Sequence, residues 1–342
     1  LTLYLGAGVS VDSGIPTWEK LVAAMYFFAL TQDHHQRALK YAYRNYLFAI
    51  AEWYLQTTRE PMDITARKVR ASYQARPNEF IRDLRNTLYT SLISGPHDRM
   101  GGTNRGETLD FLHTNETLQA VVNLCRSASG VRSVITYNYD NLLEISLGKD
   151  RQCKPVWKAN QRCPASRLPC YHVHGYIPLQ QRVRGSKIRE IIFTEEQYHE
   201  AANTSYSWSN LVQLQCMGNN IGLCIGLSLT DHNMRRLLDA MARTPIPPKI
   251  YAILPKPKPT PVRAADQRKI RKLAAEYLLN FSERARMKNP DSELGEVKDI
   301  VQAVELSDTI WQETILHELG VSVLWIDNFG EITTLLDAVR DA

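Results

Sequence analysis

The first 18 residues, LTLYLGAGVSVDSGIPTW, constrain the fold more than any other stretch of this 342-residue chain. Residues 1–5 are an apolar run of strand-forming residues, and Gly6-Ala7-Gly8 follows at once. Glycines directly after a first strand let backbone amides approach a diphosphate that a Cβ atom would keep away. A helix after such a turn offers an anion its unpaired N–H groups and the positive end of its dipole. The stretch is therefore typical of how a nucleotide-binding α/β domain begins.

The glycine spacing alone leaves two interpretations open. In the dinucleotide-binding fingerprint a third glycine stands three positions after the second, but this chain has Val11 there and Gly14 later. Gly6 and Gly8 could equally make a tight turn between a strand and a helix. The choice between the two interpretations therefore depends on longer motifs.

Four longer motifs follow one another along roughly the first two thirds of the chain. The first is GAGVS, then two residues, then SGIP. The second is TYNYD at residues 136–140, after an expected strand, and the third is YHVHG at residues 171–175. The fourth is IGLSL at residues 225–229, with Asp231 shortly behind it. In this order they resemble the motifs of sirtuins, a family that binds NAD and cleaves its nicotinamide bond.

The resemblance implies a catalytic pair, Asn138 and His174. Cleavage of nicotinamide from NAD develops positive charge at C1′ of the ribose, so the site must orient the ribose and present a nucleophile to one face. Asn138 would orient the ribose and the attacking water, and His174 would be the general base for that water or a ribose hydroxyl. On a regular strand His172 and His174 would share a face, so alternation cannot choose between them. The resemblance favours His174, because it stands before the glycine of the motif.

The resemblance also implies which residues bind NAD. The diphosphate would be held by Gly6, Ala7, Gly8 and Ser10, the nicotinamide end by Asp140, and the adenosine side by Gly226 and Ser228. Further contacts would come from other residues in or beside the same motifs, namely Ser13, Gly14, Ile15, Pro16, Thr17, Trp18, Thr136, Leu229 and Asp231.

The order of strand and helix signals predicts an α/β fold, a doubly wound (Rossmann-like) parallel sheet with a helical insertion module and no zinc subdomain. We expect one sirtuin-like domain over residues 1–342, with residues 19–106 as the helical insertion and residues 107–342 as the remainder of the Rossmann-like core. Strands are expected at residues 1–5, 131–135, 188–193, 221–225, 249–254 and 321–326.

The expected helical insertion separates this chain from the protein-deacylating sirtuins. Residues 15–94 contain no glycine, which suits long helices, with Pro61 and Pro77 as breaks between them. Deacylases of the family carry Asp-Phe-Arg after the proline of the first motif, where this chain has Thr17-Trp18. The departure disfavours deacylase chemistry and resembles the NAD-cleaving sirtuin-like domains of bacterial antiphage defence proteins.

The six cysteines predict neither a disulfide framework nor a zinc ribbon. Deacylating sirtuins usually hold a structural zinc with two Cys-x-x-Cys pairs, and this sequence contains none. Residues 153–169, where that zinc module would lie, are expected to be a loop-rich insertion. Cys153, Cys163 and Cys170 with His172 could form a metal site, but their spacing fits no known ribbon. We therefore expect no metal.

These features together predict an NAD+ glycohydrolase that uses water as the acceptor and depletes cellular NAD in bacterial antiphage defence by abortive infection. Two alternatives remain open at this stage. One is an NAD-dependent protein deacylase or ADP-ribosyltransferase, which would need a groove for an acyl-lysine. The other is a sensor of NAD or ADP-ribose that binds without turnover, for which Asn138 and His174 would both be unnecessary.

Charge and hydropathy limit the expected partners. The chain has 41 basic and 36 acidic residues, and a formal charge of +5 does not indicate direct nucleic-acid binding. No apolar run approaches the roughly 18 residues of a membrane span, and the domain type favours the cytoplasm. Leu1 already lies inside a strand, so we expect further residues before it. Because an NAD-destroying enzyme must be silent in a healthy cell, we expect a homo-oligomer or a partner such as a HerA-type ATPase, an Argonaute or another defence-system sensor.

Overall fold

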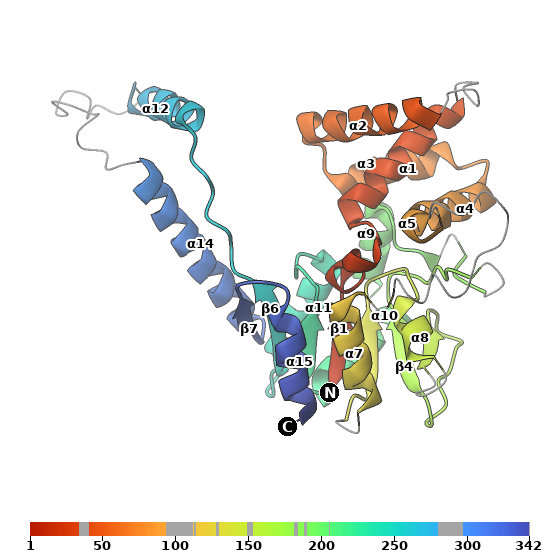
Figure 1. Ribbon diagram of the computed structural model, residues 1–342. Coiled ribbons are helices and arrows are strands. Elements are labelled where there is room, and N and C mark those ends of the chain that lie inside the picture. The colour runs from red at the N-terminus through yellow and green to blue at the C-terminus, as the bar shows by residue number, and fades with distance from the viewer. Residues whose placement is uncertain are drawn as a thin grey trace.

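The computed structural model describes residues 1–33, 41–93, 112, 114–127, 130–148, 153–180, 184–187, 190–204, 206–279 and 297–341. Seven strands in these residues form one sheet in the order β3-β4-β2-β1-β5-β6-β7, and all pairs are parallel (Figure 1). The strands are β1 (Thr2–Leu5), β2 (Ser133–Thr136), β3 (Cys153–Val156), β4 (Leu168–His172), β5 (Gly222–Ile225), β6 (Ile250–Pro255) and β7 (Val321–Ile326).

The strand order places β1 at the topological switch point of a doubly wound sheet. With the edge strand β3 set aside, the remaining strands follow the order 3-2-1-4-5-6 of dinucleotide-binding folds. The chain moves outward from β1 in one direction through β2 and β4, and in the other direction through β5, β6 and β7. The prediction of a Rossmann-like parallel sheet is confirmed.

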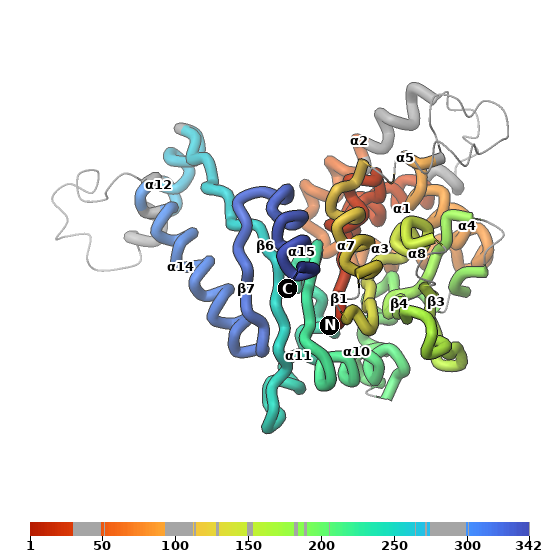
Figure 2. The backbone as a smooth tube through the Cα atoms, turned by 60° about the horizontal axis from the view of Figure 1, so that its bottom comes forward, coloured from red at the N-terminus to blue at the C-terminus, as the bar shows by residue number. Residues whose placement is uncertain are grey.

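Helices cover both faces of the sheet, as Figure 2 shows. One face carries α7 (Glu116–Arg126), α8 (Leu142–Leu147) and α15 (Glu331–Asp341), and the other carries α10 (Trp208–Asn219), α11 (His232–Ala242) and the end of α14 (Val297–Glu318). In β1, Leu3 and Leu5 pack toward the first group and Tyr4 toward the second. Because successive side chains of a strand point to opposite faces, β1 is buried on both faces along its whole length.

A group of helices stands over the carboxyl ends of the strands (Figure 1). It comprises α1 (Trp18–Asp33), α2 (Tyr41–Thr58), α3 (Met62–Ser72), α4 (Pro77–Leu88) and α5 (Thr90–Ile93). Pro61 precedes α3 and Pro77 opens α4, as expected from the missing N–H of proline. The buried Phe80 ring meets Phe193 edge-on at 5.3 Å, so these helices share the main core of the sheet. Residues 94–106 of the expected insertion lie outside the described residues.

Two sequence expectations about strands are wrong. Residues 191–193, predicted as part of a strand, pair with no strand of the described sheet. They lie beyond the strand ends, where the Ile192 N–H donates to the His174 carbonyl at 2.9 Å and the Ile192 carbonyl accepts from the Tyr139 hydroxyl at 2.6 Å. Conversely, the expected strands did not include β4 or β3, which stand at the two ends of the expected loop. Pro155 is tolerated in β3 since β3 is an edge strand.

The helices α12 (Ala264–Leu279) and α14 project away from the sheet on the β7 side (Figure 1). The proline-rich residues 255–261 lead from β6 toward α12, as the sequence predicts. Among the described residues, the helices are too short or too polar to cross a membrane. Of the basic stretch at 182–189, only residues 184–187 are described.

Candidate active site

A pocket of about 850 Å³ lies at the carboxyl ends of β1, β2 and β5. One wall comes from the residues that follow these strands, and the opposite wall comes from the starts of α1 and α3 and from α9 (Glu195–Asn203). Ligands of open α/β sheets bind at this edge, at the point where the strand order reverses. The position and the size both suit a small molecule, because ligand pockets usually enclose about 300–1,000 Å³.

The glycine turn after β1 packs directly against the end of β5. The Gly8 N–H donates to the Gly226 carbonyl at 3.0 Å, and Gly226 has a φ of +65°. A Cβ atom on Gly6 would lie only 2.4 Å from the Gly226 oxygen. Glycine is therefore required at these positions by the close approach of two backbones.

The helix expected after this turn is present as α1. Two short 3₁₀ turns, η1 (Ala7–Val9) and η2 (Val11–Ser13), come first, and α1 begins only at Trp18. Gly14 ends the second turn with a φ of 80°, which redirects the chain toward the pocket. Thr17 and Trp18 line the pocket, so the amino end of α1 faces the cavity.

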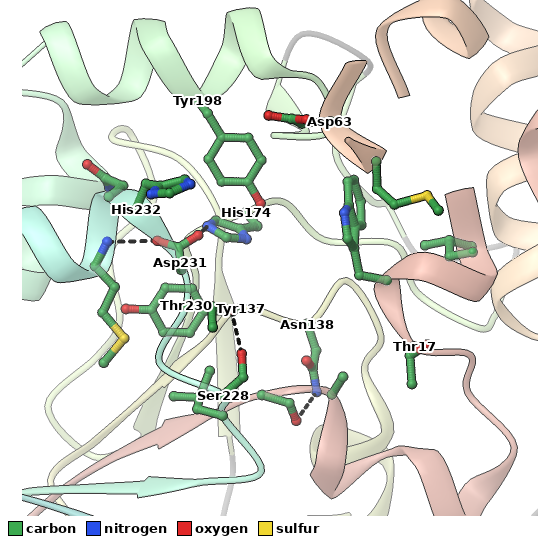
Figure 3. Close-up of a pocket in the computed structure, with 18 of the residues that line it drawn as sticks. Thr17, Asp63, Tyr137, Asn138, His174, Tyr198, Ser228, Thr230, Asp231 and His232 are labelled. Atoms are coloured by element: carbon green, nitrogen blue, oxygen red, sulfur yellow. Dashed lines mark hydrogen bonds and ion pairs between the residues drawn. The ribbon is translucent and has the colours of Figure 1, made fainter. Parts of the chain in front are cut away.

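Asn138 is fixed by the glycine turn. Its Nδ2 donates to the Gly6 carbonyl at 2.9 Å and to the Ser10 hydroxyl at 3.3 Å. Because a backbone carbonyl can only accept a hydrogen bond, this contact assigns Nδ2 to the turn and leaves Oδ1 facing the pocket (Figure 3). The Thr136 hydroxyl accepts the Asn138 N–H at 3.1 Å and further restrains the segment. An acceptor oxygen is thereby held in one orientation.

His174 follows β4 in a turn and is buried at the pocket wall. Its Nε2 lies 3.5 Å from Oδ2 of Asp231, and the rings of Tyr137 and Tyr198 meet it edge-on at 5.0 and 5.4 Å. Burial lowers the pKa of His174 below its ordinary value, and the Asp231 carboxylate partly opposes that shift. The imidazole is therefore neutral near pH 7 and able to accept a proton.

Asp231 acts on two partners. Its Oδ1 accepts the Met234 N–H at 2.7 Å and caps the amino end of α11, while Oδ2 faces His174. The cap fixes the carboxylate against the helix, so its charge stays beside the imidazole. Sequence reasoning placed Asp231 among the NAD contacts and missed this relation to His174.

The two histidines of the third motif lie on opposite faces of the sheet. His172, the last residue of β4, bonds through Nδ1 to the Asn138 carbonyl at 3.2 Å, and its Nε2 lies 2.7 Å from Oε1 of Glu144 on α8. The turn at residues 173–174 then carries His174 toward α11. The two side chains would share a face on a regular strand, but β4 ends at His172, so this expectation does not apply to His174.

Asp140 contributes a buried carboxylate to the pocket wall. Its Oδ1 accepts the Leu142 N–H at 3.1 Å, and its Oδ2 has no hydrogen-bond partner among the described residues. Burial raises the pKa of Asp140 above its ordinary value. The side-chain hydroxyl of Ser10 opposes this rise of the pKa, and Oδ2 itself is closed off from solvent.

The structure brings most of the predicted site residues to one cavity. The wall includes Gly6, Ala7, Ile15, Pro16, Thr17, Trp18, Asn138, Asp140, His174, Gly226, Ser228, Leu229 and Asp231. Five predicted contacts lie behind this wall, namely Gly8, Ser10, Ser13, Gly14 and Thr136. Thr136 is the last residue of β2, and the other four shape the turn after β1. Ser13, for example, accepts a hydrogen bond from Nδ2 of Asn115, which also donates to the Val9 carbonyl.

Several pocket residues were missed by sequence reasoning. They are Asp63, Tyr137, Tyr139, Tyr198, His199, His232 and Arg236. The two tyrosines of the second motif flank Asn138 and could have been found there. Asp63 and Tyr198 come from α3 and α9, and nothing in the sequence connects these helices to the motifs.

A family model described as "SIR2-like domain" matches residues 132–281. The chain contains a SIR2-like domain. The resemblance to sirtuins inferred from the motifs is thereby confirmed, and SIR2-like domains are NAD-dependent and use NAD+ as a substrate. The matched residues include three of the four motifs and the five strands β2 to β6. The first motif and β1, which lies between β2 and β5 in the sheet, precede the match. A comparison with curated proteins finds no match.

The ionisation of His174 in this SIR2-like domain gives a direct test of its surroundings. Because Asp231 raises the pKa of His174, we expect Asp231→Asn to lower that pKa further. Asparagine still accepts the Met234 N–H, so the cap of α11 is kept. The measurement is an NMR titration of the histidine ring protons, with the His174 signal assigned from its absence in His174→Gln. Asp63→Asn, which removes a carboxylate from the pocket rim, should leave the His174 titration in place, and an unmoved or raised pKa in Asp231→Asn would contradict the interpretation.

Proposed function

We propose that this SIR2-like domain is an NAD+ glycohydrolase, which cleaves NAD+ to nicotinamide and ADP-ribose with water as the acceptor. The observation that carries the proposal is that two catalytic candidates lie in one pocket. Asn138 holds its amide oxygen in a fixed orientation, and His174 presents a neutral imidazole beside the Asp231 carboxylate. A protein that only senses NAD+ would need neither group.

The proposed reaction breaks the bond between C1′ of the ribose and the ring nitrogen of nicotinamide. The bonding electron pair leaves with nicotinamide, and positive charge develops at C1′. Oδ1 of Asn138 accepts a hydrogen bond from the ribose or the attacking water, and His174 takes the proton that this water loses as its oxygen bonds to C1′. Asp231 stabilises the imidazolium that forms, because its carboxylate lies 3.5 Å from Nε2.

The proposed binding mode follows from the polar groups of the wall. The carboxylate of Asp140, a residue of the pocket wall, would accept a hydrogen bond from the carboxamide of nicotinamide. The diphosphate would lie against the glycine turn and the amino end of α1, which carries a positive dipole end. Ser228 and Gly226 would face the adenosine side, in keeping with their place after β5.

Water as the acceptor is supported by the wall on the side of α1. Trp18 packs edge-on against Phe193 at 5.1 Å, and Pro61, Met62 and Asp63 close the same side of the pocket. Thr17-Trp18 stands where deacylating sirtuins carry Asp-Phe-Arg. A wall of packed rings favours a small acceptor over an extended acyl-lysine peptide. We also propose a wider role, NAD depletion in bacterial antiphage defence under the control of self-assembly or a partner. This role rests on the resemblance of the sequence to the NAD-cleaving sirtuin-like domains of antiphage defence proteins.

The test is chromatography of nicotinamide and ADP-ribose after NAD+ is mixed with the purified protein. We expect equal amounts of both products without any acylated peptide, and a loss of at least about 10²-fold in Asn138→Ala, whose ribose and water are no longer oriented. NADP+ in a parallel reaction reports selectivity.

Two results would contradict the glycohydrolase. Release only in the presence of an acyl-lysine peptide would indicate a deacylase. NAD+ binding by calorimetry, without release under any of these conditions and with equal affinity in Asn138→Ala, would indicate a sensor. If release requires self-assembly, it should rise more steeply than in proportion to the protein concentration.

A further inference from the structure

A second cluster of chemically reactive side chains lies beneath the active site, on the α8 side of the sheet. It comprises Glu144 of α8, Cys153 of β3, and Cys170 and His172 of β4. The Glu144 carboxylate and the two thiols lie within 4.8 Å of one another, and Sγ of Cys170 lies 3.8 Å from Nε2 of His172. Three consecutive elements of the chain therefore bring these side chains together.

The three ligands Glu144, Cys153 and Cys170 lie close enough to share one metal ion. His172 contacts Glu144 and Cys170 but lies outside the group of three, so it would have to shift toward Cys153 to complete a tetrahedral shell. With Zn–S bonds of about 2.3 Å and Zn–N bonds of about 2.0 Å, ligand atoms lie roughly 3.3–3.8 Å apart. The separation of Cys170 and His172 falls at the upper end of this range. Glu144 and His172 are in hydrogen-bond contact at 2.7 Å, so an ion between them also requires a movement of the carboxylate.

The hydrogen bonds of His172 are those of a metal ligand. Its Nδ1 faces the Asn138 carbonyl, which can only accept, so Nδ1 carries the proton. A neutral ring then turns the lone pair of Nε2 toward the Glu144 carboxylate and the Cys170 thiol, with the side chain 1% exposed. The Glu144 carboxylate and the Cys170 sulfur both lie on the Nε2 side of the ring, where a metal ion would bind. Histidine ligands commonly donate their other ring N–H to a backbone carbonyl, as here.

We propose that Glu144, Cys153, Cys170 and His172 bind one zinc ion at the edge of the sheet. Two thiolates, an imidazole and a carboxylate form a donor set that favours zinc over magnesium or calcium, which prefer oxygen ligands. The sequence expectation of no metal depended on spacing, and β3 overturns that argument by pairing with β4. Cys163 is not a ligand, since its thiol lies 3.5 Å from the carbonyls of Pro164 and Arg167.

The proposed ion would stabilise the backbone of Asn138 in the active site through His172. It fixes Nε2 of His172, which keeps the proton on Nδ1 and so maintains the bond to the Asn138 carbonyl. The site differs from a Cys-x-x-Cys zinc module, because its ligands belong to α8, β3 and β4 of the sheet layer. The inference does not depend on the proposed NAD+ hydrolysis.

The test is the metal content of the full chain, purified under reducing conditions without chelators. We expect about one zinc per chain by plasma mass spectrometry, and the visible spectrum of tetrahedral thiolate-bound cobalt after exchange with Co²⁺. Cys153→Ser and Cys170→Ser should each weaken zinc binding at least about 10-fold, whereas Cys163→Ser, a cysteine in the same region, should bind as the parent does.

The measurements on the unaltered chain keep the test decisive even where a variant fails to fold. Absence of the cobalt–thiolate spectrum from the reduced, folded protein would overturn the proposal and leave Nε2 of His172 in a hydrogen bond with Glu144. A Cys153–Cys170 disulfide found by mass spectrometry in the native protein would also overturn it. So would an equal loss of zinc in Cys163→Ser.

Discussion

Replacing His174 with alanine is expected to reduce nicotinamide release by about 10²–10⁴-fold, the usual contribution of a positioned general base. The imidazole is buried beside the Asp231 carboxylate, and in the proposed reaction the variant would leave the attacking water without its proton acceptor. Affinity for NAD+ should change only a few-fold, because the glycine turn and Asp140 are untouched. Steady-state turnover and calorimetric binding, measured on the same preparation, separate the two effects.

Two other histidines of the same pocket supply matched controls. His199 on α9 and His232 at the start of α11 both line the cavity and are both exposed. Neither is paired with Asp231, so alanine at either position should lower turnover at most a few-fold. Equal losses in all three variants would show that the histidines act through the shape of the pocket and would contradict a specific role for His174.

The parts of the fold that could be predicted are those whose geometry is set by neighbouring residues. β1 is buried on both faces, and the turn after it needs glycine because another backbone lies against it. The residue types and their order were therefore sufficient to predict this strand and its turn. The polar residues of β2 weakened its signal, although Ser133 is buried and shares a hydrogen bond with Thr2 at 2.8 Å. A strand can contain such a residue when its neighbour in the sheet supplies the partner.

The parts that could not be predicted depend on contacts between distant segments. Residues 191–193 have the composition of a strand, but their backbone bonds to His174 and Tyr139 beyond the end of the sheet. β3 contains a lysine and a proline and becomes a strand only because the edge of β4 is available. For the site, the motifs identified Asn138 and His174 as candidates, whereas Tyr198 enters the pocket from α9 without any sequence signal.

The close contact between the turns after β1 and β5 leads to a second large expected effect. In Gly226→Ala, the new Cβ would lie 2.6 Å from the Val9 nitrogen, on a backbone with a φ of +65°. The strained φ costs about 1–2 kcal/mol, and the overpacking adds about 1–3 kcal/mol of lost unfolding free energy. Relief of the clash must move the two turns apart and break the bond from Gly8 to the Gly226 carbonyl. We therefore expect NAD+ binding to be lost together with several kcal/mol of stability in urea unfolding.

Gly130→Ala separates the two causes of this effect. Gly130 has a φ of +82°, but none of the described residues has an atom within 4 Å of the position that its Cβ would take. Its substitution should therefore cost only the backbone strain, about 1–2 kcal/mol, and leave NAD+ affinity unchanged. The difference between the two variants measures the close approach of the turns. If both variants unfold at the same urea concentration and both bind NAD+, the turns are not in the tight contact that the site requires.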